Sequence, residues 1–237
     1  MSGVAKPTKQ AGFTIIELLI ATAVFSVIIL VVTAAVLQFS RQYYKGIIAS
    51  STQGAARTLV DDISRSIQFN GGTVNPIPDN INPTGLCVGT DKRYSYALNQ
   101  QVTDAGSSLP NQGYHGLVSD DVTGCGTDTV PLDVKSLPAK LPTTLSNARE
   151  LLGQHMRVSK FSVTGGNSTN NLYTISVRIV YGDNDLLCSQ SAGDCNTPAP
   201  SSAAVLNTAT DLSCRSTVGS QFCAVSELTT TVRKRVN

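Results

Sequence analysis

Glu17 is the only charged residue in an apolar run that extends from Gly12 to Phe39. A carboxylate in such a run costs about 2.5 to 3.5 kcal/mol at the centre of a lipid bilayer, and less near the interface. It therefore requires a positively charged partner. A cut between Gly12 and Phe13 would create an α-amino group about one helical turn before Glu17, so the spacing predicts a charge pair that proteolysis makes available.

The cysteines are the second group of side chains with evident chemistry. Their even number indicates disulfides formed in an oxidising compartment. Zinc is the alternative, but the chain has no Cys-x-x-Cys pair and its two histidines, His115 and His155, stand alone. We therefore expect no metal and no cofactor, and of the fifteen possible disulfide pairings the sequential one is the simplest. The cysteines are Cys87, Cys125, Cys188, Cys195, Cys214 and Cys223.

The apolar run that carries Glu17 is long enough to cross a membrane. About 20 residues, Leu18 to Leu37, rise about 1.5 Å each in a helix and match a hydrocarbon core of about 30 Å. Their only polar side chains are Thr22, Ser26 and Thr33, whose hydroxyls can bond to carbonyls of their own helix. The run therefore predicts a membrane-spanning helix.

Gly12, Phe13, Thr14 and Glu17, followed by the aliphatic run, resemble the class III signal of type IV pilins and type II secretion pseudopilins. The resemblance implies that prepilin peptidase cuts after Gly12 and methylates the new N-terminus at Phe13. It also implies that Glu17 pairs with the terminal amine of an adjacent subunit during assembly. The implied partners are the peptidase, other pilin subunits that pack helix against helix, and an assembly platform in the inner membrane.

Two simpler interpretations compete with this one. Ala21-Thr22-Ala23 mimics the cleavage site of an ordinary secretory signal peptide, but that cut would fall inside the apolar run, and such a signal should lack Glu17. A plain membrane anchor with a glutamate at its edge is the other alternative. Neither of them gives the glutamate a partner.

The remaining chain must position and display this segment. Between Ser40 and Phe69 the pattern becomes striped, with Ile48, Leu59 and Ile63 at helical spacing, which predicts that the helix continues and docks a head domain. No proline interrupts it, so we expect one helix of about 57 residues that ends near Asn70, with Gly46 and Gly54 as soft points. The expected divisions are a leader at 1–12, a membrane-spanning half-helix at 13–39, an amphipathic half-helix at 40–70 and a head at 71–237.

The head should be an antiparallel sheet packed on the helix, which makes the fold α+β with disulfides. Alternation predicts its best strand at 172–181, paired with 155–163 across a bulge near Lys160. Residues 70–85 carry three prolines and should contain neither helix nor central strand. The other expectations are strands at 93–98 and 222–232, an irregular stretch at 102–145, a brief helix at 146–154 and a hairpin turn at 183–185.

Nothing in the sequence indicates catalysis, since no nucleophile elbow, phosphate loop or metalloprotease motif is present. Charged residues make up 14% of the chain, and loss of the leader would reduce the 18 basic residues to 16, equal to the 16 acidic ones. This balance gives no support for a nucleic-acid-binding head.

We therefore expect a structural subunit, a larger minor pilin of a type IV pilus or related filament. It would begin as a single-pass membrane protein with a cytoplasmic leader and an extracytoplasmic head, then join a cell-surface pilus or a periplasmic pseudopilus. One alternative is the J-type minor pseudopilin of type II secretion, which residues 59–63 loosely resemble. The other is a tip receptor for DNA or surfaces, which should carry a basic or aromatic patch.

Overall fold

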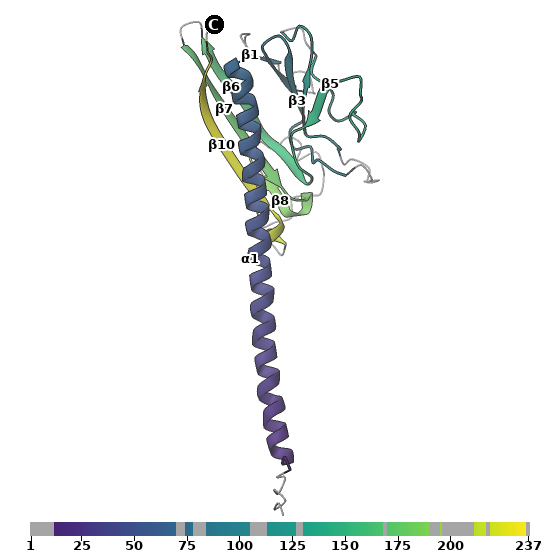
Figure 1. Ribbon diagram of the computed structural model, residues 1–237, viewed down its shortest axis with the longest axis vertical. Helices are drawn as coiled ribbons and strands as arrows, with labels where there is room; N and C mark the ends of the chain where they lie inside the picture. Colours follow the sequence, from purple (N-terminus) through teal and green to yellow (C-terminus); the bar gives the residue numbers. More distant parts are fainter. Residues whose placement is uncertain are drawn as a thin grey trace, which may run out of the picture. The chain divides into compact units, whose positions relative to one another are not determined.

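The computed structural model describes residues 12–69, 74–77, 84–104, 113–126, 130–167, 170–189, 195, 211–216 and 219–235. The chain forms two compact units, Met1–Tyr43 and Tyr44–Asn237, and each is treated by itself below. Helix α1, Ile15–Phe69, has 55 residues and contributes to both (Figure 1). It starts two residues later than expected and runs through Gly46 and Gly54 without interruption, while the expected cap at Asn70 lies outside the described residues.

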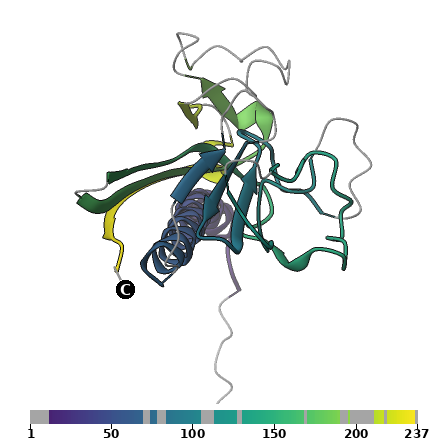
Figure 2. The same ribbon diagram turned by 90° about the horizontal axis from the view of Figure 1, so that it is seen from above.

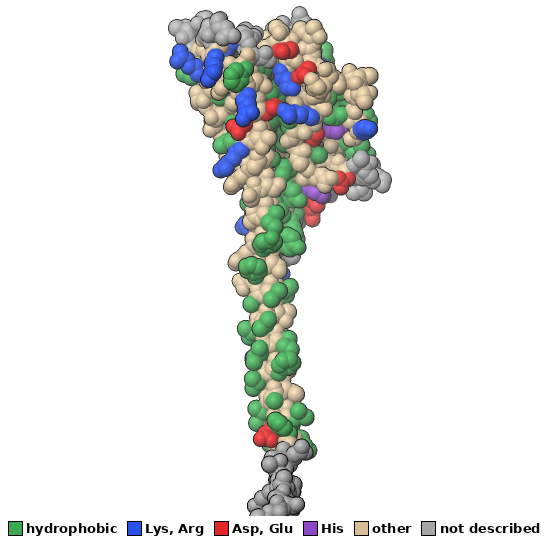
Figure 3. All heavy atoms as spheres, viewed as in Figure 1, with side chains coloured by type: hydrophobic (Ala, Val, Ile, Leu, Met, Phe, Trp, Pro, Cys, Tyr) green, Lys and Arg blue, Asp and Glu red, His purple; other side chains and the backbone are tan. Residues whose placement is uncertain are grey.

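The first unit contains only the apolar half of α1 among its described residues. Every residue from Gly12 to Phe39 is exposed, and hydrophobic side chains dominate the surface of this half (Figure 3). The helix is long and apolar enough to span a membrane by length and composition. An uninterrupted run of Val, Ile, Leu and Ala favours such a continuous helix. In a lipid environment no water is available to the backbone, so its polar groups must form hydrogen bonds within the helix.

The described residues of the second unit form two larger antiparallel sheets and one small one. The first follows the chain in the order β1-β2-β3-β4-β5, the second has the order β10-β7-β6, and the third pairs β8 with β9. Their bounds are β1 Val74–Ile77, β2 Thr84–Val88, β3 Lys92–Tyr96, β4 Leu117–Asp121, β5 Ser146–Glu150, β6 Met156–Asn167, β7 Asn170–Tyr181, β8 Leu187–Ser189, β9 Leu212–Cys214 and β10 Ala224–Arg233. The described residues also form two short 3-10 helices, η1 Asn184–Leu186 and η3 Ser220–Phe222.

The second half of α1 packs against both larger sheets, whose strands lie beside it in the view from above (Figure 2). Ile63, at the centre of the stripe, is completely buried. The alternating side chains of β7 enter the same core, together with Leu86, Tyr94 and Leu117 from the five-stranded sheet. The buried helix residues are Ile48, Thr52, Ala56, Leu59, Val60, Ile63 and Ile67. The α+β fold with a long helix packed on antiparallel sheets is thus confirmed.

Four expected strands are present as β3, β6, β7 and β10. The register between β6 and β7 shifts between Val158 and Lys160, where the apolar alternation of the sequence predicts a bulge. Pro76 lies in β1, which is at the edge of its sheet. Proline is compatible with that position because an edge strand leaves one row of N–H groups without a strand partner.

Four local expectations are wrong. The stretch 70–85 does contain strand, since 74–77 form β1 at the sheet edge and Thr84 and Gly85 begin β2, which lies between β1 and β3. Residues 146–154 form no helix, because 146–150 are strand β5 and pair with β4. The stretch 102–145 is not irregular throughout, since it contains β4, whose Asp120 is buried against Arg93. Residues 183–185 are not a hairpin turn, because the chain passes through η1 into β8, which pairs with β9 instead of β7. In each case pairing with other strands outweighs the local preference of the sequence.

All six cysteines are in disulfides, and each bridge joins cysteines that follow one another in the chain. The bridge between Cys87 and Cys125 links β2 to the loop after β4. The other two, Cys188–Cys195 and Cys214–Cys223, lie around the small sheet. They stabilise a part of the head whose own apolar cluster is small.

Candidate functional site: the start of the helix

Helix α1 begins with reciprocal hydrogen bonds between Thr14 and Glu17. The Glu17 Oε2 atom accepts from the Thr14 backbone N–H at 2.9 Å and from the Thr14 hydroxyl at 2.8 Å. The backbone N–H of Glu17 donates in return to Thr14 Oγ1 over 3.3 Å. This is a capping box, in which residues three apart satisfy N–H groups that the first helical turn leaves without a partner.

This cap was not among the expected features, although Thr-x-x-Glu before an apolar run is its usual signal. The cap matters for the proposed cleavage, because a cut between Gly12 and Phe13 leaves the Thr14 N–H as an ordinary peptide group. The hydrogen bonds that orient Glu17 therefore survive the cut. Glu17 uses Oε2 in the cap, and its Oε1 atom has no polar partner among the described residues.

Gly12 and Phe13 lie just before the helix and are exposed, with 84% of Phe13 accessible. The peptide bond between them lies outside the helix, in a segment without regular secondary structure. A protease needs such access, because a peptide bond inside a helix is held in the wrong conformation and partly covered. The expected cleavage bond is therefore exposed to solvent. Phe13 precedes Glu17 by four residues in the chain.

The hydroxyls of Thr22, Ser26 and Thr33, farther along the apolar half of α1, all bond to carbonyls of their own helix. Thr22 Oγ1 donates to Leu19 O at 3.0 Å, and Ser26 Oγ donates to Thr22 O at 2.7 Å. Thr33 Oγ1 donates to Ile29 O at 2.8 Å. These bonds satisfy the three hydroxyls without water, and Glu17 is the only charged side chain from Phe13 to Phe39, so no cation in this stretch can pair with it.

The described part of the head contains no cluster of three or more His, Cys, Asp or Glu side chains that could hold a metal ion. His115 is buried, with Nδ1 at 3.3 Å from Glu150 Oε2 and Nε2 at 2.9 Å from the carbonyl oxygen of Pro138. Contact with the Glu150 carboxylate raises the pKa of His115, against the effect of burial. His155 pairs with Asp183 at 3.0 Å on the surface. Both histidines thus have structural partners.

Arg157 is a buried cation that the sequence did not single out. Its guanidinium donates to Gly182 O at 2.8 Å and to Asn184 Oδ1 at 2.7 Å. Burial lowers its pKa to about 10, which still leaves the group charged at neutral pH. It joins β6 to the connection between β7 and β8, a structural task.

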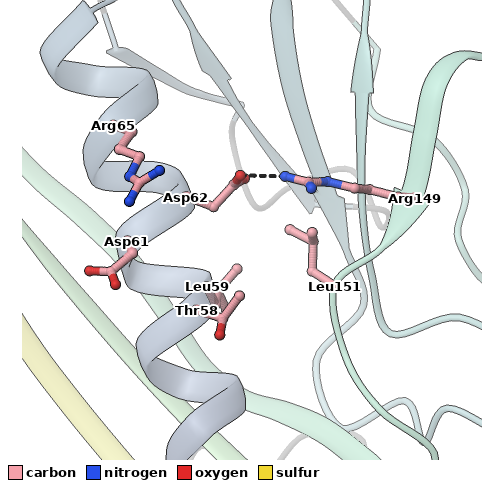
Figure 4. A pocket seen from close by; sticks show the side chains of 7 residues that line it. All are labelled: Thr58, Leu59, Asp61, Asp62, Arg65, Arg149 and Leu151. Carbon is pink, nitrogen blue, oxygen red and sulfur yellow. Dashed lines mark hydrogen bonds and ion pairs between the residues drawn. The ribbon is translucent and has the colours of Figure 1, made fainter.

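A cavity of about 240 Å³ lies between the second half of α1 and the end of β5 (Figure 4). Asp62 links the helix to the five-stranded sheet beside this cavity. One of its carboxylate oxygens accepts a hydrogen bond from Tyr94 Oη at 2.9 Å, and the other contacts Arg149. Tyr94 Oη is also 2.8 Å from Ser66 Oγ, and burial raises the pKa of Tyr94. No pattern in the sequence indicates this cavity, because its lining residues come from two segments far apart in the chain. They are Thr58, Leu59, Asp61, Asp62, Arg65, Arg149 and Leu151.

Comparison with known proteins supports the assignment of the helix start. Residues 7–33 match the family model described as the prokaryotic N-terminal methylation motif. This motif is typical of type IV pilins and pseudopilins, and the matched residues include Gly12, Phe13 and Glu17. It is the motif of pilin-like substrates of prepilin peptidase, and it implies assembly with other pilin subunits. No curated protein and no solved structure matches the chain.

Proposed function

We propose that this chain is a minor pilin, a low-copy structural subunit of a type IV pilus or a closely related filament. The observation that carries the proposal is the methylation motif at residues 7–33, followed by an uninterrupted apolar helix. The two features serve one process. The motif directs cleavage and methylation that create a new N-terminus at the membrane surface, and the apolar helix then packs against the helices of other subunits. The apolar helix also indicates membrane anchoring before assembly.

Processing starts at the exposed bond between Gly12 and Phe13. Hydrolysis by prepilin peptidase releases the leader, and the α-amine of Phe13 then receives one methyl group from a methyl donor. The product is a secondary amine, which still binds a proton and still carries a positive charge at neutral pH. Methylation thus leaves the charge that Glu17 requires.

In assembly, Glu17 accepts the charged N-terminus of a neighbouring subunit. The cap with Thr14 holds the carboxylate at the start of the helix and occupies Oε2, so Oε1 is available to the incoming amine. An amine paired with a carboxylate inside an apolar bundle removes two unfavourable charges from lipid at once. If the incoming helix sat at another height along the filament axis, its terminal amine would not reach Glu17, and the carboxylate would stay unpaired. The charge pair therefore favours one axial offset between neighbouring subunits.

Low copy number is supported by the helix and by the head. Residues Phe13 to Phe39 contain neither glycine nor proline, and α1 is continuous through them. Glycine and proline are the residues at which a helix most readily unwinds. Without them, this helix has no position at which its backbone could unwind locally when many copies stack in a filament. The large second unit, Tyr44–Asn237, would also crowd its neighbours in a fibre made only of this chain. Both features suit a position with few neighbours, such as the tip.

Two mass measurements test the proposal. Intact mass of the membrane-extracted protein should correspond to a chain that begins at Phe13 with one methyl group. Quantitative mass spectrometry of sheared filaments should find the chain present at a small fraction of the most abundant pilin. A mature terminus after Ala23 would contradict the processing, and a copy number equal to that of the main subunit would contradict the minor role.

A further inference from the structure

Phe222, an aromatic residue of the head, lies against Tyr44, the residue of α1 at which the second unit begins. The centroids of the two rings are 5.9 Å apart, and the ring planes meet at 48°. Both side chains stay largely open to solvent, since 44% of Phe222 and 51% of Tyr44 is exposed. The pair therefore forms a small aromatic surface on the outside of the head rather than part of its core.

The backbone around Phe222 is well fixed. Phe222 is the last residue of η3, and its N–H donates to Gly219 O at 2.8 Å. Gly219 has a φ of 100°, a conformation that favours glycine and turns the chain into η3. The next residue, Cys223, is buried and is joined by a disulfide to Cys214. The head thus holds this apolar ring at its surface in one place.

Exposed apolar side chains are common on protein surfaces, so exposure alone indicates nothing. The height of the aromatic pair along α1 is what distinguishes it. Tyr44 follows Phe39, the last residue of the apolar run, by five residues, or about 7 Å of helix. The headgroup layer on each side of a bilayer is about 5 to 7 Å thick. Because helical side chains lean toward the N-terminus of their helix, the Tyr44 ring belongs at headgroup level, and Phe222 beside it does too.

The charges around the aromatic pair also suit lipid headgroups. The chain has no Asp or Glu between Glu17 and Asp61, whereas Arg41 and Lys45 flank Tyr44. Both cations are exposed, and neither forms an ion pair with a residue that the structure describes. On the side of the head, residues 216–226 include no charged residue. Cations attract lipid phosphates, and aromatic rings enter the boundary between headgroups and acyl chains.

We propose that Phe222 and Tyr44 insert together into the headgroup region of the bilayer before assembly, so that the head rests on the lipid surface. This inference rests on the membrane anchoring that is part of the proposed function. A single spanning helix can rotate about its own axis and tilt in the bilayer. A second contact, made by the head through Phe222, fixes one rotation of the helix and so determines which of its faces meets other subunits. The contact breaks when the subunit leaves the membrane for the filament.

The first experiment uses the absence of tryptophan from the chain, which makes Phe222→Trp a unique fluorescent reporter of similar shape. The matched control is Leu172→Trp, because Leu172 is 43% exposed in the same unit. Leu172 pairs with Arg233 at one end of the ladder between β7 and β10, whereas Ala224, two residues after Phe222, pairs with Tyr181 at the other end. The control thus places an equally exposed tryptophan far from the aromatic pair.

The full chain is reconstituted in vesicles of phosphatidylcholine and phosphatidylglycerol, with or without bromine on the upper part of the acyl chains. Bromine quenches a tryptophan that it contacts. Since interfacial apolar groups enter the headgroup and acyl boundary, Phe222→Trp should emit at shorter wavelength and lose about half of its fluorescence in brominated vesicles. Leu172→Trp should show neither change. Disulfide mapping and thermal unfolding should match the unchanged chain for both variants.

Equal quenching of the two variants, or no quenching of Phe222→Trp, would overturn the inference. The proposed function would stand in that case, provided that the unchanged chain fractionates with the membranes of cells that make it. Absence of the unchanged chain from those membranes would overturn the anchoring, and the inference with it.

The second experiment identifies what Phe222 touches in cells that make the chain but do not assemble filaments. Photoreactive p-benzoylphenylalanine in place of Phe222 should crosslink to phospholipid, seen as an added lipid mass on the peptide that contains position 222. The same substitution of Leu172 should give no lipid adduct. A crosslink from position 222 to a protein instead of lipid, or no crosslink at all, would contradict the proposal.

Discussion

At the scale of single residues, Glu17 has two separable roles, as an acceptor in the helix cap and as a negative charge. Glu17→Gln retains an oxygen for the Thr14 N–H and loses the charge, whereas Glu17→Ala loses both. If pairing with a terminal amine drives assembly, both variants should insert in the membrane and fold but be nearly absent from filaments. Comparison of the chain in membranes and in sheared filaments measures this. Normal incorporation of the Gln variant would leave only the cap as the function of Glu17.

His115 is the residue whose charge should make the stability of the head depend on pH. Its contact with Glu150 raises its pKa above the ordinary value of 6.5, so the folded state binds the proton more tightly than the unfolded state. The stabilisation is complete below about pH 6.5 and is lost as the pH rises through the folded-state pKa. Thermal unfolding of the full chain in detergent should show this decrease, and His115→Gln should abolish it. An unchanged decrease in that variant would assign it to another group.

At the scale of elements, the stripe on α1 should contribute most of the energy that holds the helix to the sheets. Ile63 is 0% exposed, and replacing it by alanine should lower the free energy of unfolding by about 2 to 5 kcal/mol. Ile47 lies on the same helix and is 47% exposed, so Ile47→Ala should change that free energy by about 0.5 kcal/mol or less. Denaturant unfolding measures both. Similar losses for the two variants would mean that the stripe is not the docking surface.

At the scale of the whole molecule, the three disulfides should differ in value because they close loops of different length. The bridge Cys87–Cys125 spans 38 residues, whereas Cys214–Cys223 spans 9. Loop-closure entropy then predicts losses of about 4 and about 2.5 kcal/mol when each pair is replaced by serine. Unfolding of the two double-serine variants, with peptide mapping to verify the remaining bridges, tests the order. A larger loss for Cys214–Cys223 would show that local packing outweighs chain entropy.

Local patterns in the sequence were sufficient for the elements that depend on near neighbours. The apolar run after Glu17 predicts the helix because its backbone bonds are all internal, and the alternation from Leu172 to Tyr181 predicts β7 because one strand face is buried. The helix start could likewise be predicted from Gly12, Phe13 and Glu17, which lie within six consecutive residues of the chain. Short spacing makes such features independent of the rest of the fold.

Only the tertiary structure decided the features that join distant segments. Strand β5 looks helical by itself and becomes a strand because β4 offers it a ladder of hydrogen bonds. The cavity lies where Asp62 on the helix meets Arg149, which follows it by more than eighty residues in the chain. No spacing in the sequence encodes that meeting, since it results from the sum of many weak packing preferences over the whole head. The sequence by itself determined the long apolar helix and the methylation motif at its start, and only the folded head determined which side chains from distant segments meet.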